Sequence, residues 1–245
     1  MSAPVVCSVL VLVPFAAVTW QASRAAIPWA IGSAAAELIY FRALARQYRA
    51  LPVERSYPVA RGTAPLLVLG VGLVVGRAPG GLAALGVAVL GAGVALTAGT
   101  RADVDRTWSF TLPVSAAIAT YTLLDSFGIR HAGPTAYLLL TMAPVAAVLL
   151  AGDLRTQGVS ATLGSYRSGS VWLAGSGITG AYLLVLLALS RAAPDQAAVI
   201  SGLRETSVVM VPLLAWLVLR RRPSGAVLAG SALVLAGLVL VRIAG

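Results

Sequence analysis

The sequence predicts an all-α protein: a polytopic transmembrane bundle of nine helices, built as two inverted repeats. Three observations support this fold class. The chain is 59% hydrophobic and only 11% charged, which makes it more apolar than ordinary soluble domains. Its apolar runs approach about 20 residues, the length that crosses the hydrocarbon core of a bilayer. Its second half also repeats features of its first half at a nearly constant offset.

Nine apolar runs, each bounded by Gly, Pro, Arg or Asp, are the predicted spans. Backbone groups in lipid need internal hydrogen bonds, and long runs without alternation favour helices over a closed barrel. The connections are short except for Asp153–Gly169, so little of the chain is left for a soluble domain. The runs are Pro4–Trp20, Ile27–Arg46, Tyr57–Gly76, Gly80–Gly99, Thr107–Gly128, Gly133–Gly152, Ser170–Arg191, Gln196–Leu219 and Gly225–Ile243.

The internal repeat shows which spans are equivalent. The matched pairs, 143 or 144 positions apart, are Trp29 with Trp172, Gly32 with Gly175, Ser33 with Ser176, Arg61 with Arg204, Gly86 with Gly230, and Gly93 with Gly237. We therefore predict a first, incomplete repeat of four helices over residues 1–99 and a second repeat of five helices over residues 107–245. The fifth span has no counterpart, so the parent design is five plus five helices with the first one missing. An odd number of spans per repeat makes the second copy enter from the opposite face.

Charge and motif content exclude several classes of protein. The formal net charge is +10, but the eighteen basic residues are all arginines in short groups between apolar runs. This distribution fits loops beside anionic lipid head groups better than a nucleic-acid surface. A single Cys7 and a single His131 leave no disulfide or His-rich metal site. With no phosphate-binding loop and no nucleophile motif, the sequence predicts neither an enzyme nor a cofactor.

Ionisable residues inside predicted spans are the main candidates for a binding site, because they are costly in lipid. Glu37 lies about ten residues into its span, roughly 15 Å deep. It could carry a coupling proton; it could equally be a neutral carboxyl bonded to a neighbouring helix or paired with an arginine. Arg61 and Arg204 occupy equivalent positions, and two guanidinium forks facing one cavity would bind a carboxylate or phosphonate group. The alternative is that each caps carbonyls or joins an ion pair.

Four further residues are candidate substrate contacts. Tyr121 and Asp125 lie one turn apart on one helical face, although an interfacial cap or a salt bridge to Arg130 would equally explain Asp125. Tyr57 precedes Pro58, and because proline has no N–H, a backbone carbonyl can be left free to bind a ligand. Alternatively, Pro58 simply starts or kinks a helix. Glu205 follows Arg204 directly, so the two side chains do not face each other on a helix.

Small residues four positions apart predict close helix packing in lipid. The two candidate pairs are Gly72 with Gly76 and Ser176 with Gly180. We interpret both as seams of the bundle that carry no chemistry.

Several ordered segments resemble a known family. They are YPVARGTAPLL, IATYTLLDSFGIRHAG, ISGLRETSVVMVPLLAWLVLRRR and GAVLAGSALVLAGLVLVR. At their spacing they resemble the EamA-type drug/metabolite transporters, and the resemblance extends over nearly the whole chain. It implies ten helices in two inverted halves and movement of small metabolites, often outward. This sequence lacks the first of those helices.

The functional prediction is a secondary transporter in the cell membrane that exports a small anionic or zwitterionic metabolite, with a proton as the candidate coupling ion. The alternative is a truncated, non-transporting membrane partner or regulatory subunit. The expected partners are a small-molecule substrate and the lipid bilayer, without nucleic acid; a homodimer or a companion subunit stays open. The arginine distribution places the N-terminus in the cytoplasm, whereas the resemblance implies the opposite orientation.

Overall fold

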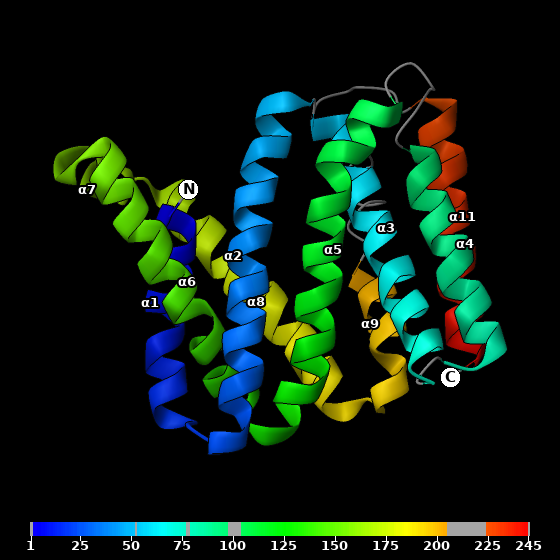
Figure 1. Ribbon diagram of the computed structural model, residues 1–245, viewed down its shortest axis with the longest axis horizontal. Helices are drawn as coiled ribbons and strands as arrows, with labels where there is room; N and C mark the ends of the chain where they lie inside the picture. Colours follow the sequence, from blue (N-terminus) through cyan, green and yellow to red (C-terminus); the bar gives the residue numbers. More distant parts are fainter. Residues whose placement is uncertain (1, 52, 77–78, 98–103, 205–223, 245) are drawn as a thin grey trace. The chain divides into compact units, whose positions relative to one another are not determined.

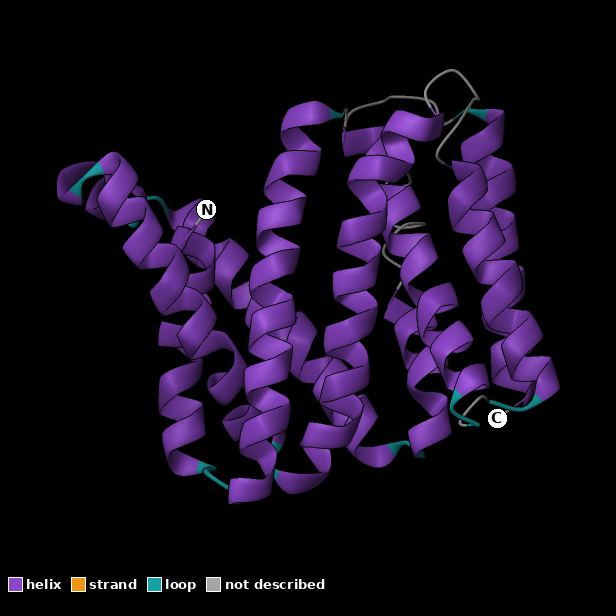
Figure 2. Ribbon diagram, viewed as in Figure 1, coloured by secondary structure: helices purple, strands orange, loops and turns teal. Residues whose placement is uncertain are grey.

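A computed structural model describes residues 2–51, 53–76, 79–97, 104–204 and 224–244. In these ranges the chain is helical and contains no β-strand beyond an isolated antiparallel bridge between Ala22 and Ala132 (Figures 1 and 2). The α-helices are α1 (Ser2–Val18), α2 (Ile27–Ala50), α3 (Val53–Val74), α4 (Gly81–Thr97), α5 (Val104–Gly128), α6 (Pro134–Gln157), α7 (Val159–Ser165), α8 (Gly169–Arg191), α9 (Ala197–Arg204) and α11 (Gly225–Ala244). Short 3-10 turns are η1 (Arg24–Ala26), η3 (Ile129–His131) and η4 (Pro194–Gln196).

The helices follow the predicted apolar runs within a few residues at each end. The long connection after the sixth run is itself partly helical, because α7 occupies Val159–Ser165. Of the run Gln196–Leu219, α9 covers the first part, and residues 205–223 lie outside the described residues. The prediction of a helical bundle is therefore confirmed, while the count of nine spans stays a prediction.

Three described helical segments are long and apolar enough to cross a membrane: Trp108–His131, Pro134–Gln157 and Gly169–Arg191. Four shorter apolar helical segments accompany them, at Ser2–Val18, Val59–Val74, Gly81–Leu96 and Gly225–Val241. Large apolar side chains on the outside of such helices, for example Leu184 and Val239, fit contact with lipid.

The described residues form two compact units. Unit 1 contains Met1–Leu38 and Leu124–Ala192; unit 2 contains Ile39–Leu123 and Ala193–Gly245. Each unit therefore takes helices from both halves of the sequence. Helices α2 and α5 contribute residues to both units, because the boundaries fall after Leu38 and Leu123.

In unit 1, α1 packs against α6 and α8. A side chain at Gly175 of α8 would collide with α1, since an added Cβ would lie 2.8 Å from the carbonyl oxygen of Pro4. This close approach brings Ser8 Oγ within 2.7 Å of Thr179 Oγ1 in a buried hydrogen bond. The absence of a side chain thus lets two apolar helices meet and share a polar contact.

In unit 2, α4 packs along α11 and against α3 and α9; Figure 1 shows α4 and α11 side by side. An added Cβ on Gly93 would lie 2.7 Å from the carbonyl oxygen of Gly230, so the backbones nearly touch at this crossing. Leu90, Val94 and Val234 are fully buried in a cluster beside it.

The observed close contacts differ from the predicted seams. An added Cβ on Gly180 would meet nothing within 4 Å. Gly76 follows the end of α3 with a φ of 68°, and its N–H bonds the carbonyl of Leu73 at 3.4 Å, so it terminates the helix. Spacing alone identifies small residues but cannot show which face of a helix meets a neighbour.

Candidate functional site

Asp125 is the centre of a buried polar cluster in unit 1. Ser33 Oγ donates to Asp125 Oδ1 at 2.6 Å, and Tyr137 Oη donates to the same oxygen at 3.1 Å. Tyr182 Oη donates to Asp125 Oδ2 at 2.6 Å. The three hydroxyls come from α2, α6 and α8, while Asp125 itself is on α5 and is 1% exposed. Four helices therefore meet at one carboxyl group.

Two glycines let the helices come close enough for these bonds. A Cβ on Gly128 would occupy the position of the Tyr137 ring, so this ring can lie against the end of α5 only because the residue is glycine. A Cβ on Gly32 would lie 3.2 Å from Leu124 Cδ1, which leaves little room for a larger residue beside Ser33. Trp29 stacks on Phe127 at 5.1 Å and packs the same end of α5 against α2.

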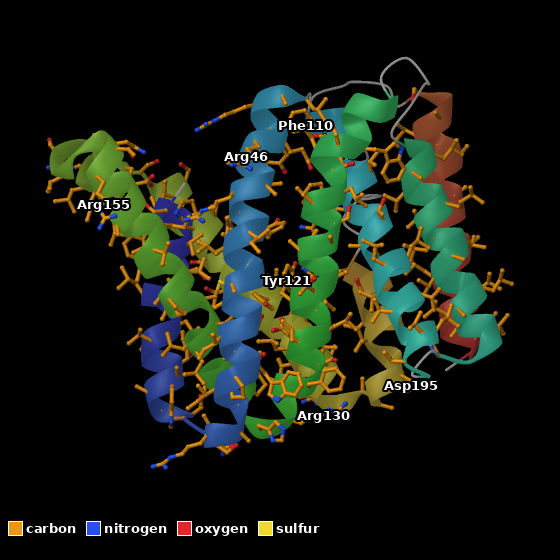
Figure 3. All side chains as sticks on the ribbon, viewed as in Figure 1. Arg46, Phe110, Tyr121, Arg130, Arg155 and Asp195 are labelled. Carbon is orange, nitrogen blue, oxygen red and sulfur yellow. The ribbon has the colours of Figure 1, made fainter. Side chains whose placement is uncertain are left out.

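Hydroxyl donors suit a carboxylate in an apolar surrounding. A buried charge is costly unless it is hydrogen-bonded, and hydrogen bonds to charged acceptors contribute about 1.5–3 kcal/mol each. The neighbouring Arg130 lies just past α5, is exposed, and donates through Nη2 to the carbonyl oxygen of Ala192 (Figure 3). Asp125 thus has three specific donors from other helices, which an interfacial cap would not need.

Arg204 is the centre of a second polar cluster, in unit 2. Its Nη2 donates to Tyr121 Oη at 2.9 Å, and its Nη1 donates to Thr122 Oγ1 at 3.4 Å. The guanidinium carbon lies 5.5 Å from the centroid of the Tyr121 ring, and the Tyr40 ring meets that ring edge-on at 6.0 Å. Tyr121 is 4% exposed and is labelled on α5 in Figure 3.

This second arrangement orients a cation. Arginine presents several N–H donors in a planar fork, and an aromatic face attracts the guanidinium by cation–π interaction. Both named acceptors are neutral hydroxyl groups on consecutive residues of α5. A carboxylate or phosphonate reaching this guanidinium would find it already oriented, which lowers the entropy cost of binding.

The predicted site residues are divided between the two units. Glu37 is 3% exposed on α2 in unit 1, and Arg61 is half-buried on α3 in unit 2, where α3 packs against α9. Helix α3 runs through Tyr57, whose side chain is outside the description, and Glu205 lies outside the described residues altogether. Among the described residues, the structure places the predicted residue Tyr121 against Arg204.

Sequence reasoning missed the hydroxyl partners. Each belongs to a side-chain type that is common in apolar helices, and none is charged, so no single position stood out. Ser33 had appeared only as part of the internal repeat. The hydroxyl partners are Ser33, Thr122, Tyr137 and Tyr182, and the ring of Tyr40 packs edge-on against Tyr121.

Metal ligands do not gather in the part of the chain that the structure describes. No three His, Cys, Asp or Glu side chains lie close enough there to hold an ion.

The apolar helices and the polar clusters within them define an integral membrane protein. The profile of the EamA-like transporter family matches residues 108–243, more than half of the chain. The chain belongs to this family of membrane transporters, as the sequence segments predicted. No curated protein matches the chain.

Proposed function

We propose that this protein is a secondary transporter of the cell membrane that moves a small anionic or zwitterionic metabolite outward, coupled to a proton. The observation that carries the proposal is the Arg204 cluster: a half-buried guanidinium oriented by Tyr121 and Thr122 within an apolar bundle. A guanidinium charge within membrane-spanning helices raises the free energy of the folded protein unless it binds a substrate or a structural partner. Membership of a transporter family supports the first use.

The equivalent arginine strengthens the argument for an anionic group. Arg61 lies on α3, which packs against the helix that carries Arg204. Two guanidinium groups would together balance a carboxylate or phosphonate, and a zwitterion would bring its own positive charge. Tyr57 and Glu205 remain proposed substrate contacts on the evidence of the sequence. The sequence also predicts Glu37 as a carrier of the coupling proton.

We also propose that the two halves are inverted repeats. Each unit contains equivalent helices from both halves, α1 with α6 in unit 1 and α4 with α11 in unit 2. Gly86 and Gly237 approach each other's carbonyl oxygens reciprocally, the pattern of a local two-fold relation. The family match over residues 108–243 nearly coincides with the proposed second repeat over 107–245 and supports its extent.

The test is counterflow in proteoliposomes with radiolabelled probes of different charge. Succinate, methylphosphonate and glycine represent dianions, phosphonates and zwitterions, and mannitol is the neutral control. We expect flux of at least one of the first three but not of mannitol. Arg204→Ala should remove that flux, whereas Arg191→Ala, at an exposed arginine that ends α8, should retain it.

Two outcomes would contradict the proposal. Equal flux in wild type and Arg204→Ala would remove the arginine from the substrate site. A folded protein that moves no probe but co-purifies stoichiometrically with another membrane protein would favour the non-transporting alternative.

A further inference from the structure

Asp125 accepts hydrogen bonds at both carboxyl oxygens from hydroxyl groups on several helices. Both of its oxygens accept bonds, and the three donors are hydroxyls from three helices other than its own. Asp153, by comparison, accepts bonds from the Ser2 backbone N–H and from Gln157 on its own helix. The Asp125 cluster therefore ties one carboxyl to the packing of four helices.

The geometry points to a proton as the ligand of this carboxyl. We propose that Asp125, and not Glu37, binds the coupling proton. Asp125 is 1% exposed and both of its oxygens already accept hydrogen bonds, so an ammonium group or a metal ion would have to displace a hydroxyl group to reach the carboxylate. A proton need not displace one, because it can be passed along hydroxyl groups that both donate and accept hydrogen bonds.

The surrounding elements carry few other ionisable groups. Tyr137 comes from α6 and Tyr182 from α8, and both donate to the carboxyl. Glu37 lies one turn beyond Ser33 on α2, on the same face. Beyond α5, η3 contributes Arg130 and His131; α1, which packs on α6 and α8, contributes only Cys7.

Proton uptake changes the hydrogen bonds in a defined way. The ionised carboxylate is an acceptor only, so all three hydroxyls donate to it. When a proton forms an O–H bond at Oδ2, this oxygen becomes a donor and Tyr182 must accept or turn away. The proton comes from a hydronium ion in water, whose O–H bond breaks as the carboxyl O–H bond forms, and it leaves by the reverse step. Protonation thus changes the contact between α5 and α8 within unit 1.

The position of Asp125 indicates the side from which the proton arrives. The apolar segment Trp108–His131 ends six residues after Asp125. At about 1.5 Å per residue this distance is roughly 9 Å along the axis, well short of half a bilayer. Arg130 is exposed at this end. We therefore assign proton exchange to water on the side of Arg130.

Infrared difference spectroscopy tests proton binding without any metabolite. The protein is placed in phosphatidylcholine nanodiscs and the pH is stepped, with the carboxylic-acid C=O band as the readout. We expect one component of the band to be lost in Asp125→Asn and retained in Glu37→Gln and in the matched control Asp153→Asn. An unchanged band in Asp125→Asn, or loss of the component in Glu37→Gln alone, would overturn the assignment.

Tyrosine variants keep the proposal testable if Asp125→Asn does not fold. Tyr182→Phe removes one donor and should shift the pH at which the band appears. Tyr166→Phe is the control, because the Tyr166 hydroxyl is buried in the same unit and has no hydrogen-bond partner among the described residues. An unshifted band in a folded Tyr182→Phe would refute the role of the hydroxyls.

A coupling role for Asp125 rests on the proposed transport function, so proton binding and transport are tested separately. If no probe is transported but the band component is lost in Asp125→Asn, the proton site stands and the transport proposal falls. If a probe is transported with the same pH dependence in Asp125→Asn and wild type, Asp125 does not couple it.

Discussion

Gly86 of α4 and Gly237 of α11 face each other with their backbones in contact. A Cβ on Gly86 would lie 2.9 Å from the carbonyl oxygen of Gly237, and a Cβ on Gly237 would lie 2.6 Å from that of Gly86. Neither backbone can move aside as a flexible side chain could. The crossing therefore depends on glycine at both positions, which were matched by the sequence repeat to Gly230 and Gly93.

We predict that Gly86→Ala destabilises the protein by about 1–3 kcal/mol, the usual cost of overpacking. Gly70→Ala in α3 is the control, because an added Cβ there meets nothing within 4 Å. It should be neutral or stabilising by up to about 1 kcal/mol, since alanine favours helices over glycine. Thermal unfolding in detergent measures both variants. Equal stabilities would mean that the crossing is not tightly packed.

Removing the buried hydrogen bond between Ser8 and Thr179 in unit 1 is predicted to cause a smaller loss of stability. Thr179→Val keeps the shape of the side chain but removes the contacts of Thr179 Oγ1 with Ser8 Oγ and with the Ser8 carbonyl oxygen. Bonds between membrane helices average about 0.6 kcal/mol and reach about 1.7 kcal/mol. We expect a loss in this range. Ser170→Ala, which removes an exposed hydroxyl pair with Ser168, should change the unfolding midpoint less.

The Tyr121 hydroxyl is predicted to orient Arg204 without contacting substrate. Tyr121→Phe keeps the ring beneath the guanidinium and removes the hydroxyl acceptor that lies 2.9 Å from Arg204 Nη2. A hydrogen bond to a charged group contributes about 1.5–3 kcal/mol. Part of this loss should appear as a rise of about three- to tenfold in the apparent KM for the transported probe. Thr122→Val, at the longer contact of 3.4 Å, should have the smaller effect. A larger effect of Thr122→Val would reverse the assignment.

Orientation in the membrane can be read from introduced cysteines, because the single native Cys7 is buried. Ser23 and Ser160 are exposed beyond opposite ends of α6, and the second lies between Arg155 and Arg167. The positive-inside rule predicts that Ser160→Cys is cytoplasmic. A membrane-impermeant maleimide added to intact cells should then label Ser23→Cys and spare Ser160→Cys. The reverse labelling would support the orientation that the family resemblance implies.

The sequence was sufficient to predict a helical bundle and to name candidate site residues, which stay predictions. Helix positions were predictable because hydrophobic length is a local property, and lipid permits few alternatives. Tyr121 and Asp125 could be named as candidates because charge and spacing stand out within an apolar run. The prediction of close helix packing at Gly76 and Gly180 was wrong, because spacing does not show whether a neighbouring helix is present.

By itself the sequence determined a helical membrane protein of the EamA-like family with a few charges placed inside its helices. Only the tertiary structure decided which groups meet those charges. The donors to Asp125 come from α2, α6 and α8, and Arg204 reaches a tyrosine 83 positions earlier in the chain. Serine and tyrosine hydroxyls in apolar helices look alike in sequence. Which hydroxyl groups reach a charged group depends on which helices lie close together. Glycines permit that close approach, and the positions of the helices depend on packing between distant parts of the chain.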